Sequence, residues 1–138
     1  MKSSTIYYDI IPLGGSKMND YIINFLKEIM AIDSPSGYTK EVIHHCQKEA
    51  ENLGFHTHQT NKGNLEIYVE GQDDYTVGFC GHVDTLGLMV RSIKSDGTLA
   101  FTNVGGPIIP TLDGEYCRIH TRSGKCYTGT ILSNYPAV

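Results

Sequence analysis

The sequence lacks several features that would place it in whole classes of protein. It has no tryptophan, only five prolines and no run of 18 or more apolar residues, so no membrane-spanning helix can be read from it. Its 11 lysines and arginines are scattered and are outnumbered by 15 acidic residues, which argues against a nucleic-acid partner. No charged region followed by a long apolar stretch opens the chain, so we expect a cytoplasmic protein with reduced thiols.

Cysteine is also sparse, and its spacing excludes two common sites. The four cysteines are Cys46, Cys80, Cys117 and Cys126, and no C-x-x-C pair occurs among them. A structural zinc knuckle and a thioredoxin-type site are therefore unsupported. Cys117 and Cys126 could face each other across a hairpin, although reduced, half-buried thiols are favoured.

What is present fits one globular domain: 138 residues, of which 40% are hydrophobic. Residues 1–17 are interpreted as an extension or tag-like segment, with a short β-arm as the alternative. A helix begins near Met18, capped by Asn19 or Asp20. Six apolar residues then follow helical spacing and predict one apolar face: Tyr21, Ile22, Phe25, Leu26, Ile29 and Met30.

A turn at residues 33–37 separates this helix from a second one over residues 38–53, which Gly54 ends in a left-handed conformation. Val42, Ile43, Cys46, Ala50 and Leu53 are expected to face inward. Strands are then expected at residues 55–59, 65–69 and 75–80, the last of them buried. This order of elements predicts an α/β fold for residues 18–85.

The pattern of expected secondary structure changes after Asp84. Short strands are expected at residues 86–93, 98–102, 115–120 and 126–132, with glycine-rich turns between them and no helical pattern. Residues 86–138 therefore read as a β module, either a small barrel or a sandwich.

One short stretch carries recognisable chemistry: Phe79-Cys80-Gly81-His82-Val83-Asp84-Thr85. If strand geometry persists, the two-residue period places His82 and Asp84 on one face. An imidazole binds divalent metals well, and a nearby carboxylate can accept its other N–H and fix its tautomer. Gly81 would allow close approach of the backbone. An H-x-D motif alone is common by chance.

The other histidines and serines have simpler interpretations. His44 and His45 are expected to face solvent from the second helix. His56 and His58 alternate on a strand, where a solvated face is favoured over a surface metal pair. Ser34-Pro35-Ser36-Gly37 lacks the strand–turn–helix setting of a catalytic serine.

Residues 81–90, G-H-V-D-T-L-G-L-M-V, resemble the first metal-ligand segment of the glutamyl/deblocking, or tetrahedral, aminopeptidases, metallopeptidase family forty-two. Some members of that family are named as endoglucanases. The family form is close to A-H-M-D-E-I-G-F-M-V. Further similar segments lie at residues 31–37, 61–65, 103–106 and 129–131, so the resemblance extends from residue 18 to residue 138. Thr85 departs from the usual acidic residue, and G-H-x-D-T is as typical of the related dizinc dipeptidases and deacylases.

The resemblance implies a fold and a set of roles. The fold is the N-terminal part of a dimetal aminopeptidase α/β sandwich (residues 18–85), followed by a small, incomplete PDZ-like β-barrel for dimerisation (residues 86–138). His82 would be a metal ligand and Asp84 the catalytic carboxylate that orients it. The family's other ligands are a bridging Asp, a Glu-Glu pair, another Asp and a late His, all of which lie beyond the β module.

The resemblance also implies partners and an activity. The whole enzyme would hold two divalent ions, zinc or otherwise cobalt or manganese, act on peptides and self-associate as a dimer up to a dodecamer, with no nucleic-acid or membrane partner. The 138-residue chain is expected to be inactive alone, with at most one weak metal site. Its α/β part should leave apolar sheet surface uncovered. The alternatives are a dizinc dipeptidase or deacylase, and a non-catalytic self-association module.

Overall fold

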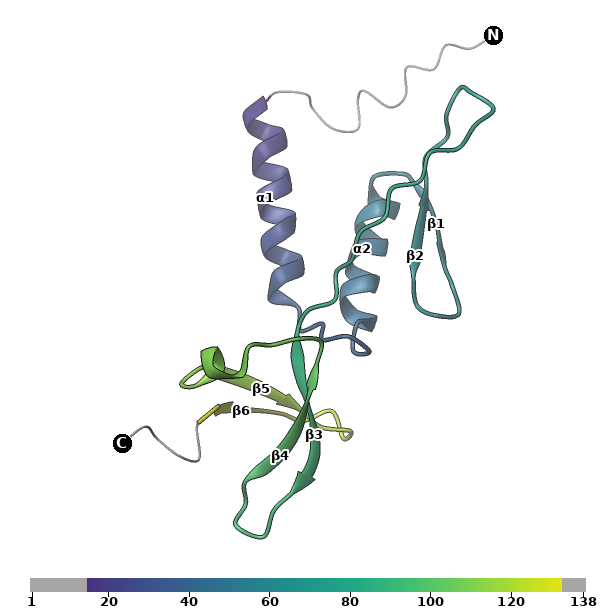
Figure 1. Ribbon diagram of the computed structural model, residues 1–138. Coiled ribbons are helices and arrows are strands. Elements are labelled where there is room, and N and C mark those ends of the chain that lie inside the picture. The colour runs from purple at the N-terminus through teal and green to yellow at the C-terminus, as the bar shows by residue number, and fades with distance from the viewer. Residues whose placement is uncertain (1–14, 133–138) are drawn as a thin grey trace. The chain divides into compact units, whose positions relative to one another are not determined.

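A computed structural model describes residues 15–132 of the chain, and its ribbon is drawn in Figure 1. Its elements are α1 (Gly15–Ala31), α2 (Lys40–Asn52), β1 (His56–Gln59), β2 (Leu65–Tyr68), β3 (Gly87–Ile93), β4 (Leu99–Val104), the 3₁₀ turn η1 (Ile109–Leu112), β5 (Tyr116–His120) and β6 (Cys126–Thr130). The strands pair as three antiparallel hairpins, β1–β2, β3–β4 and β5–β6. The chain divides into two compact units, Met1–Gly105 and Gly106–Val138.

Helix α1 begins at Gly15, earlier than the sequence pattern predicted. Asn19 and Asp20 therefore lie inside the helix, and the prediction that one of them caps it is wrong. Ser16 and Lys17 do not oppose helix formation, so the helix continues back to a glycine. Of the extension predicted over residues 1–17, residues 15–17 form the first turn of α1, and residues 1–14 lie outside the described part.

Only one stripe of the apolar face predicted for α1 is packed. Tyr21, Phe25 and Ile29 are half-buried. The other three residues of the predicted face are exposed: Ile22, Leu26 and Met30. The packed stripe meets α2, which runs beside α1 in Figure 1. A single neighbouring helix can cover only one stripe of side chains on α1. A second packing partner would be needed to cover the exposed apolar stripe.

Helix α2 carries the buried centre of the first unit. Val42 is fully buried and Ala50 nearly so, and Cys46 is half-buried between them, where burial raises the pKa of its thiol. Gly54 adopts a φ of +84°, which confirms the predicted left-handed stop. The chain then enters β1, which packs on α2.

His45 corrects the expectation that it faces solvent. Its ring is half-buried and stacks on Phe25, with ring centroids 5.6 Å apart and planes 13° apart. Its Nε2 lies 3.1 Å from Oε2 of Glu28. A histidine can join helix packing in this way because its ring is flat and only its nitrogens need polar partners. His44 is exposed, as predicted.

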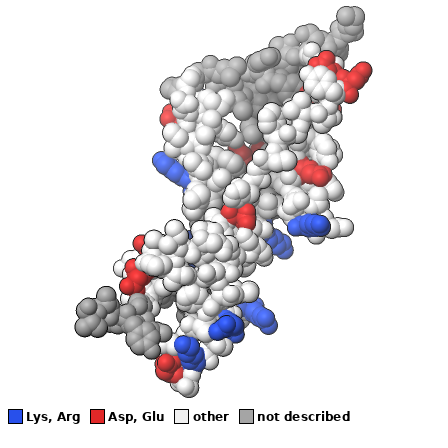
Figure 2. Space-filling view, in the orientation of Figure 1, with Lys and Arg blue, Asp and Glu red and all other residues white. Residues whose placement is uncertain are grey.

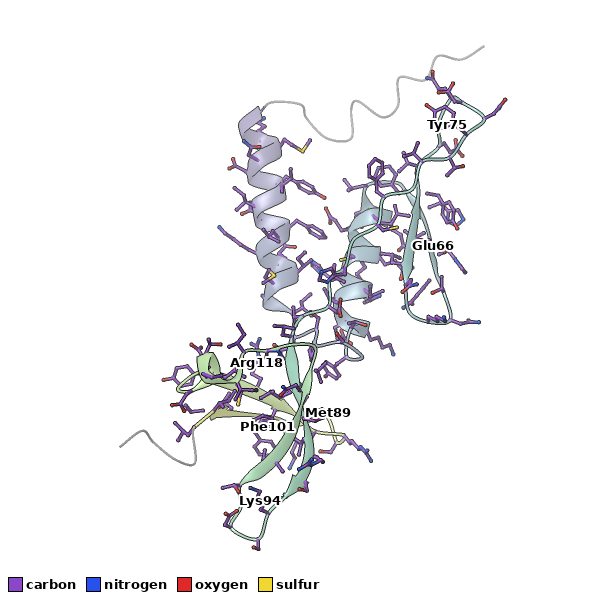
Figure 3. The ribbon with its side chains drawn as sticks, viewed as in Figure 1. Glu66, Tyr75, Met89, Lys94, Phe101 and Arg118 are labelled. Carbon is purple, nitrogen blue, oxygen red and sulfur yellow. The ribbon has the colours of Figure 1, made fainter. Side chains whose placement is uncertain are left out.

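The prediction of a buried third strand at residues 75–80 is wrong. Those residues form no regular element, and the side chains of Tyr75, Val77 and Phe79 are 72%, 62% and 96% exposed. Figure 3 labels Tyr75 on the loop that follows β2. A strand needs a neighbour for its backbone groups, and no strand among residues 15–132 pairs with this segment. The expectation that the α/β part leaves apolar sheet surface uncovered is confirmed on β2, where Ile67 and Tyr68 are 47% and 53% exposed.

The four strands predicted after residue 85 are confirmed, with ends that differ by up to two residues. The β3–β4 ladder contains an irregularity between Val90 and Ser92. In β5–β6, Cys117 lies opposite Gly129 and Cys126 lies opposite His120, so the two cysteines do not face each other and the less favoured alternative of a facing pair does not hold. A sequence pattern identifies strands but not their register. All four cysteines are free.

Candidate metal centre

The site is built from two segments that are far apart in the sequence. The loop between α1 and α2 forms a parallel bridge from Pro35 to Thr85. Thr85 N–H donates to the carbonyl of Ser34 at 2.8 Å, and Ser36 N–H donates to the carbonyl of Thr85 at 3.3 Å. The Ser34 side chain is 1% exposed, and its hydroxyl donates to the carbonyl of Val83 at 2.9 Å. These bonds fix the loop against residues 82–85.

Two glycines make this close approach possible. Tyr38 N–H donates to the carbonyl of Pro35 at 2.7 Å and closes a turn in which Gly37 has a φ of +88°, as glycine adopts at the third position of a type II turn. Gly87 lies directly against the loop, because a Cβ at this position would be 2.6 Å from Cβ of Pro35. A side chain at Gly87 would therefore push the two segments apart.

His82 and Asp84 lie within hydrogen-bond distance of each other. Nδ1 of His82 is 3.0 Å from Oδ1 of Asp84 and 3.2 Å from the Asp84 carbonyl. A carboxylate only accepts, so Nδ1 carries the proton, and in the neutral imidazole Nε2 then has the lone pair. The His82 side chain is 84% exposed. Its Nε2 is therefore free of the Asp84 contact and available to a ligand from solution.

The Ser36 hydroxyl completes the arrangement by donating to Oδ2 of Asp84. This hydrogen bond is the main reason that the pKa of Asp84 lies below its usual range; desolvation opposes the shift and His82 supports it. Asp84 is thus a carboxylate near neutral pH, with one oxygen engaged by Ser36 and the other by His82.

The predicted pair is brought together, but not by the geometry that was predicted. Residues 76–84 form no strand, and the pairing comes from the bridge to the α1–α2 loop. Sequence reasoning missed Ser34 and Ser36. The sequence signal for these two serines is the similarity of residues 31–37 to a segment of the family. That similarity does not predict a contact with Asp84.

The donor set fits one part of a metal site. The exposed nitrogen of His82 and its hydrogen-bonded carboxylate form the arrangement in which an outer carboxylate orients a histidine ligand. A zinc site needs three or four protein ligands. Among residues 15–132, no group of three or more His, Cys, Asp or Glu side chains is placed to hold a metal ion.

A second cluster on the β1–β2 hairpin is a solvated face, as predicted. Nδ1 of His58 is 2.9 Å from Oε2 of Glu66, and the Tyr68 hydroxyl donates to the same oxygen at 2.8 Å. His56 lies tilted against the Tyr68 ring, with centroids 5.8 Å apart. All four side chains are exposed, and the hydrogen bonds from His58 and Tyr68 lower the pKa of Glu66. Figure 3 labels Glu66 on this hairpin.

Charged side chains are dispersed over the molecular surface in view. Figure 2 shows basic and acidic residues scattered among uncharged ones on this face, in keeping with 11 basic and 15 acidic residues. In the described part of the chain, no helix is both long and apolar enough to cross a membrane.

The chain is similar to known aminopeptidases. The family model of the M42 glutamyl aminopeptidases matches residues 63–138. A protein of Bacillus subtilis (strain 168) named "Putative aminopeptidase YhfE" is 40% identical over 117 residues, which are 84% of this chain and 34% of that protein. The crystal structure of the TET aminopeptidase from the marine sediment archaeon Thaumarchaeota archaeon SCGC AB-539-E09 aligns with a TM-score of 0.76 at 28% identity, over 84% of this chain and 32% of that one. The chain thus spans about a third of the length of both proteins and has the fold of that part of an aminopeptidase.

Proposed function

Because this chain belongs to the M42 glutamyl aminopeptidase family, we propose that it is the N-terminal portion of a metal-dependent aminopeptidase that removes N-terminal residues from peptides. The observation that carries the proposal is the His82 ring, which Asp84 holds at 3.0 Å while its other nitrogen stays exposed. The chain spans about a third of its relatives, so the activity belongs to a longer protein.

Each residue of the site has a distinct role in this proposal. His82 would ligate a metal through Nε2, and Asp84 would fix the tautomer and raise the basicity of the ring by accepting from Nδ1–H. Two divalent ions, zinc or otherwise cobalt or manganese, would polarise the scissile carbonyl and lower the pKa of a bound water. With only His82 from that ligand set in its described part, this chain alone would bind metal weakly and be inactive.

The remaining parts of the proposal concern organisation. Residues 18–85 would belong to the catalytic α/β domain, and residues 86–138 to a PDZ-like dimerisation module that includes the β3–β4 and β5–β6 hairpins. The whole protein would self-associate and act on peptides in the cytoplasm. The similarity of fold to the TET aminopeptidase named above supports the assignment of these segments to an aminopeptidase.

Metal binding at His82 is tested by titrating zinc into the ¹⁵N-labelled chain and following the imidazole signals. We expect the Nε2 signal of His82 to respond in the wild type, and the zinc affinity measured by isothermal titration calorimetry to fall in His82→Ala. His44→Ala, which removes an exposed histidine of α2, should leave the His82 signal responsive. If zinc affinity were equal in the wild type and in His82→Ala, a non-catalytic self-association module would be the better description.

Activity is tested by placing this chain in YhfE in exchange for the matched region. With zinc or cobalt, we expect the chimera to hydrolyse aminoacyl-4-nitroanilides, with intact YhfE as the positive control. His82→Ala should abolish hydrolysis in the chimera, and the isolated chain should show none. A fully active His82→Ala chimera would contradict the proposed role of this histidine.

A further inference from the structure

We propose that Ser36 is a positioning residue of this site, which sets the orientation of His82 through Asp84. The inference rests on the proposed function for its assumption that His82 ligates a metal. It goes further in assigning the outermost member of the arrangement to the α1–α2 loop, 48 residues away from Asp84 in the sequence.

The hydrogen bonds form a chain with a defined direction. Ser36 Oγ donates to Oδ2 of Asp84, and Nδ1 of His82 donates to Oδ1 of the same carboxylate at 3.0 Å. With both oxygens engaged by different segments, the carboxylate cannot rotate about its Cβ–Cγ bond without losing one partner. The plane of the carboxylate, and with it the direction of the His82 ring, is therefore set by Ser36.

The backbone around Ser36 is held in place, which makes its hydroxyl an effective anchor. Ser36 is the second residue of the turn closed by Tyr38 and Pro35, and its own N–H is bonded to the Thr85 carbonyl. Ser34, one residue before the turn, is buried and bonded to Val83. Because these contacts already order the backbone of the loop, orienting the Ser36 hydroxyl costs little additional conformational entropy.

Ser34 and Ser36 perform different tasks on the same loop. The Ser34 hydroxyl bonds to a backbone carbonyl and secures the two segments to each other, whereas the Ser36 hydroxyl bonds to a side chain of the site and is exposed. Removing the Ser36 hydroxyl should therefore change the His82 ring without unfolding the loop.

The test compares Ser36→Ala, Ser36→Thr and the control Ser123→Ala in the full 138-residue chain. Ser123 is also exposed, and its hydroxyl lies 3.0 Å from that of Thr121 in the second unit. The first readout, without metal, is the tautomer of His82 from its imidazole ¹⁵N shifts. The second is the zinc dissociation constant from the response of the same signals.

In Ser36→Ala we expect a smaller fraction of the Nδ1–H tautomer. Mutating the hydrogen-bond partner of a metal-bound histidine typically weakens metal affinity about 10- to 100-fold. Because Ser36 lies one hydrogen bond further from the metal, we expect Ser36→Ala to weaken zinc binding by about 3- to 10-fold. Ser36→Thr keeps a hydroxyl and should restore both readouts, and Ser123→Ala should match the wild type.

The outcomes separate this inference from the proposed function. If His82→Ala lowers the zinc affinity measured by calorimetry while Ser36→Ala leaves tautomer and affinity unchanged, the inference is wrong and the proposed function stands. If His82→Ala itself has no effect, the proposed function fails first. If Ser36→Ala lowers affinity but Ser36→Thr does not restore it, the role of Ser36 is structural and the inference is overturned.

Discussion

Tyr21 shows how one hydroxyl joins two helices. Its phenol donates to Oε1 of Glu49 at 2.7 Å, and its ring stacks on that of Phe25, with centroids 6.3 Å apart. Burial raises the pKa of Tyr21 to about 12, and the hydrogen bond to Glu49 and the charges of Glu49 and Glu28 raise it in the same direction. The neutral phenol is therefore the form that the α1–α2 contact favours.

We expect Tyr21→Phe to lower the free energy of unfolding by about 1 kcal/mol at pH 7, the usual worth of one hydrogen bond. Because the folded-state pKa lies above the unfolded value near 10, the contribution of Tyr21 is complete below about pH 10 and is lost as pH rises towards 12. Urea unfolding at pH 7 and at pH 11 measures this. The difference between wild type and Tyr21→Phe should shrink at the higher pH, whereas a constant difference would contradict the assignment.

At this scale, the sequence identified the residues of the candidate site whose relation is local. The two-residue spacing of His82 and Asp84 is visible in the sequence, and the structure brings the pair together. Ser36 could not be found in this way, because its contact to Asp84 spans 48 residues and depends on how a loop folds back. His45 was misjudged for a related reason: its environment is set by Phe25 and Glu28 of the other helix.

At the scale of elements, local signals predicted most helices and hairpins. Gly54 ends α2 with a φ of +84°, and the turns at Gly63, Gly97 and Gly124 also have positive φ. Such signals act within a few residues, so they hold wherever the partner strand is the next one along the chain. The strand expected at residues 75–80 has no adjacent partner of this kind, and its apolar composition alone does not make it a strand.

Gly87, at the start of β3, tests how tightly the elements of the site are joined. In Gly87→Ala the new Cβ would lie 2.6 Å from Cβ of Pro35, whose ring is rigid, so the bridge between Pro35 and Thr85 must give way. We expect a loss of about 1–3 kcal/mol in the free energy of unfolding, as for other overpacked positions.

The matched control is Gly78→Ala, because nothing lies within 4 Å of a Cβ built there. Its free energy of unfolding should stay within about 0.5 kcal/mol of the wild type or rise slightly, since alanine lowers the entropy of the unfolded chain. Urea unfolding compares the two variants. Equal stabilities would show that the Pro35 contact is not tight.

At the scale of the whole molecule, the described residues bury little and expose much. Val42 and Ala50 are the buried apolar residues among them, whereas Phe79, Tyr116 and Leu132 are 96%, 88% and 72% exposed. Composition predicted enough apolar residues for a core, but it could not say which of them would be covered. Whether an apolar side chain is covered depends on the segments that pack against it. The chain spans only about a third of the length of its relatives, so it contains only the packing segments of that third.

This imbalance predicts that apolar side chains in the first unit divide into two groups with opposite effects. We expect Val42→Ala to lower the free energy of unfolding by about 2 kcal/mol, because Val42 is fully buried and the truncation leaves a cavity. Phe79→Ser should leave the free energy of unfolding within about 0.5 kcal/mol of the wild type, because its ring already faces water.

Phe79→Ser should instead weaken self-association in sedimentation velocity, since exposed apolar side chains drive contact between copies. Val42→Ala, measured where it is still folded, should associate like the wild type. Equal losses of stability in the two variants would mean that Phe79 is covered in solution and that the first unit packs more completely than its exposed side chains indicate.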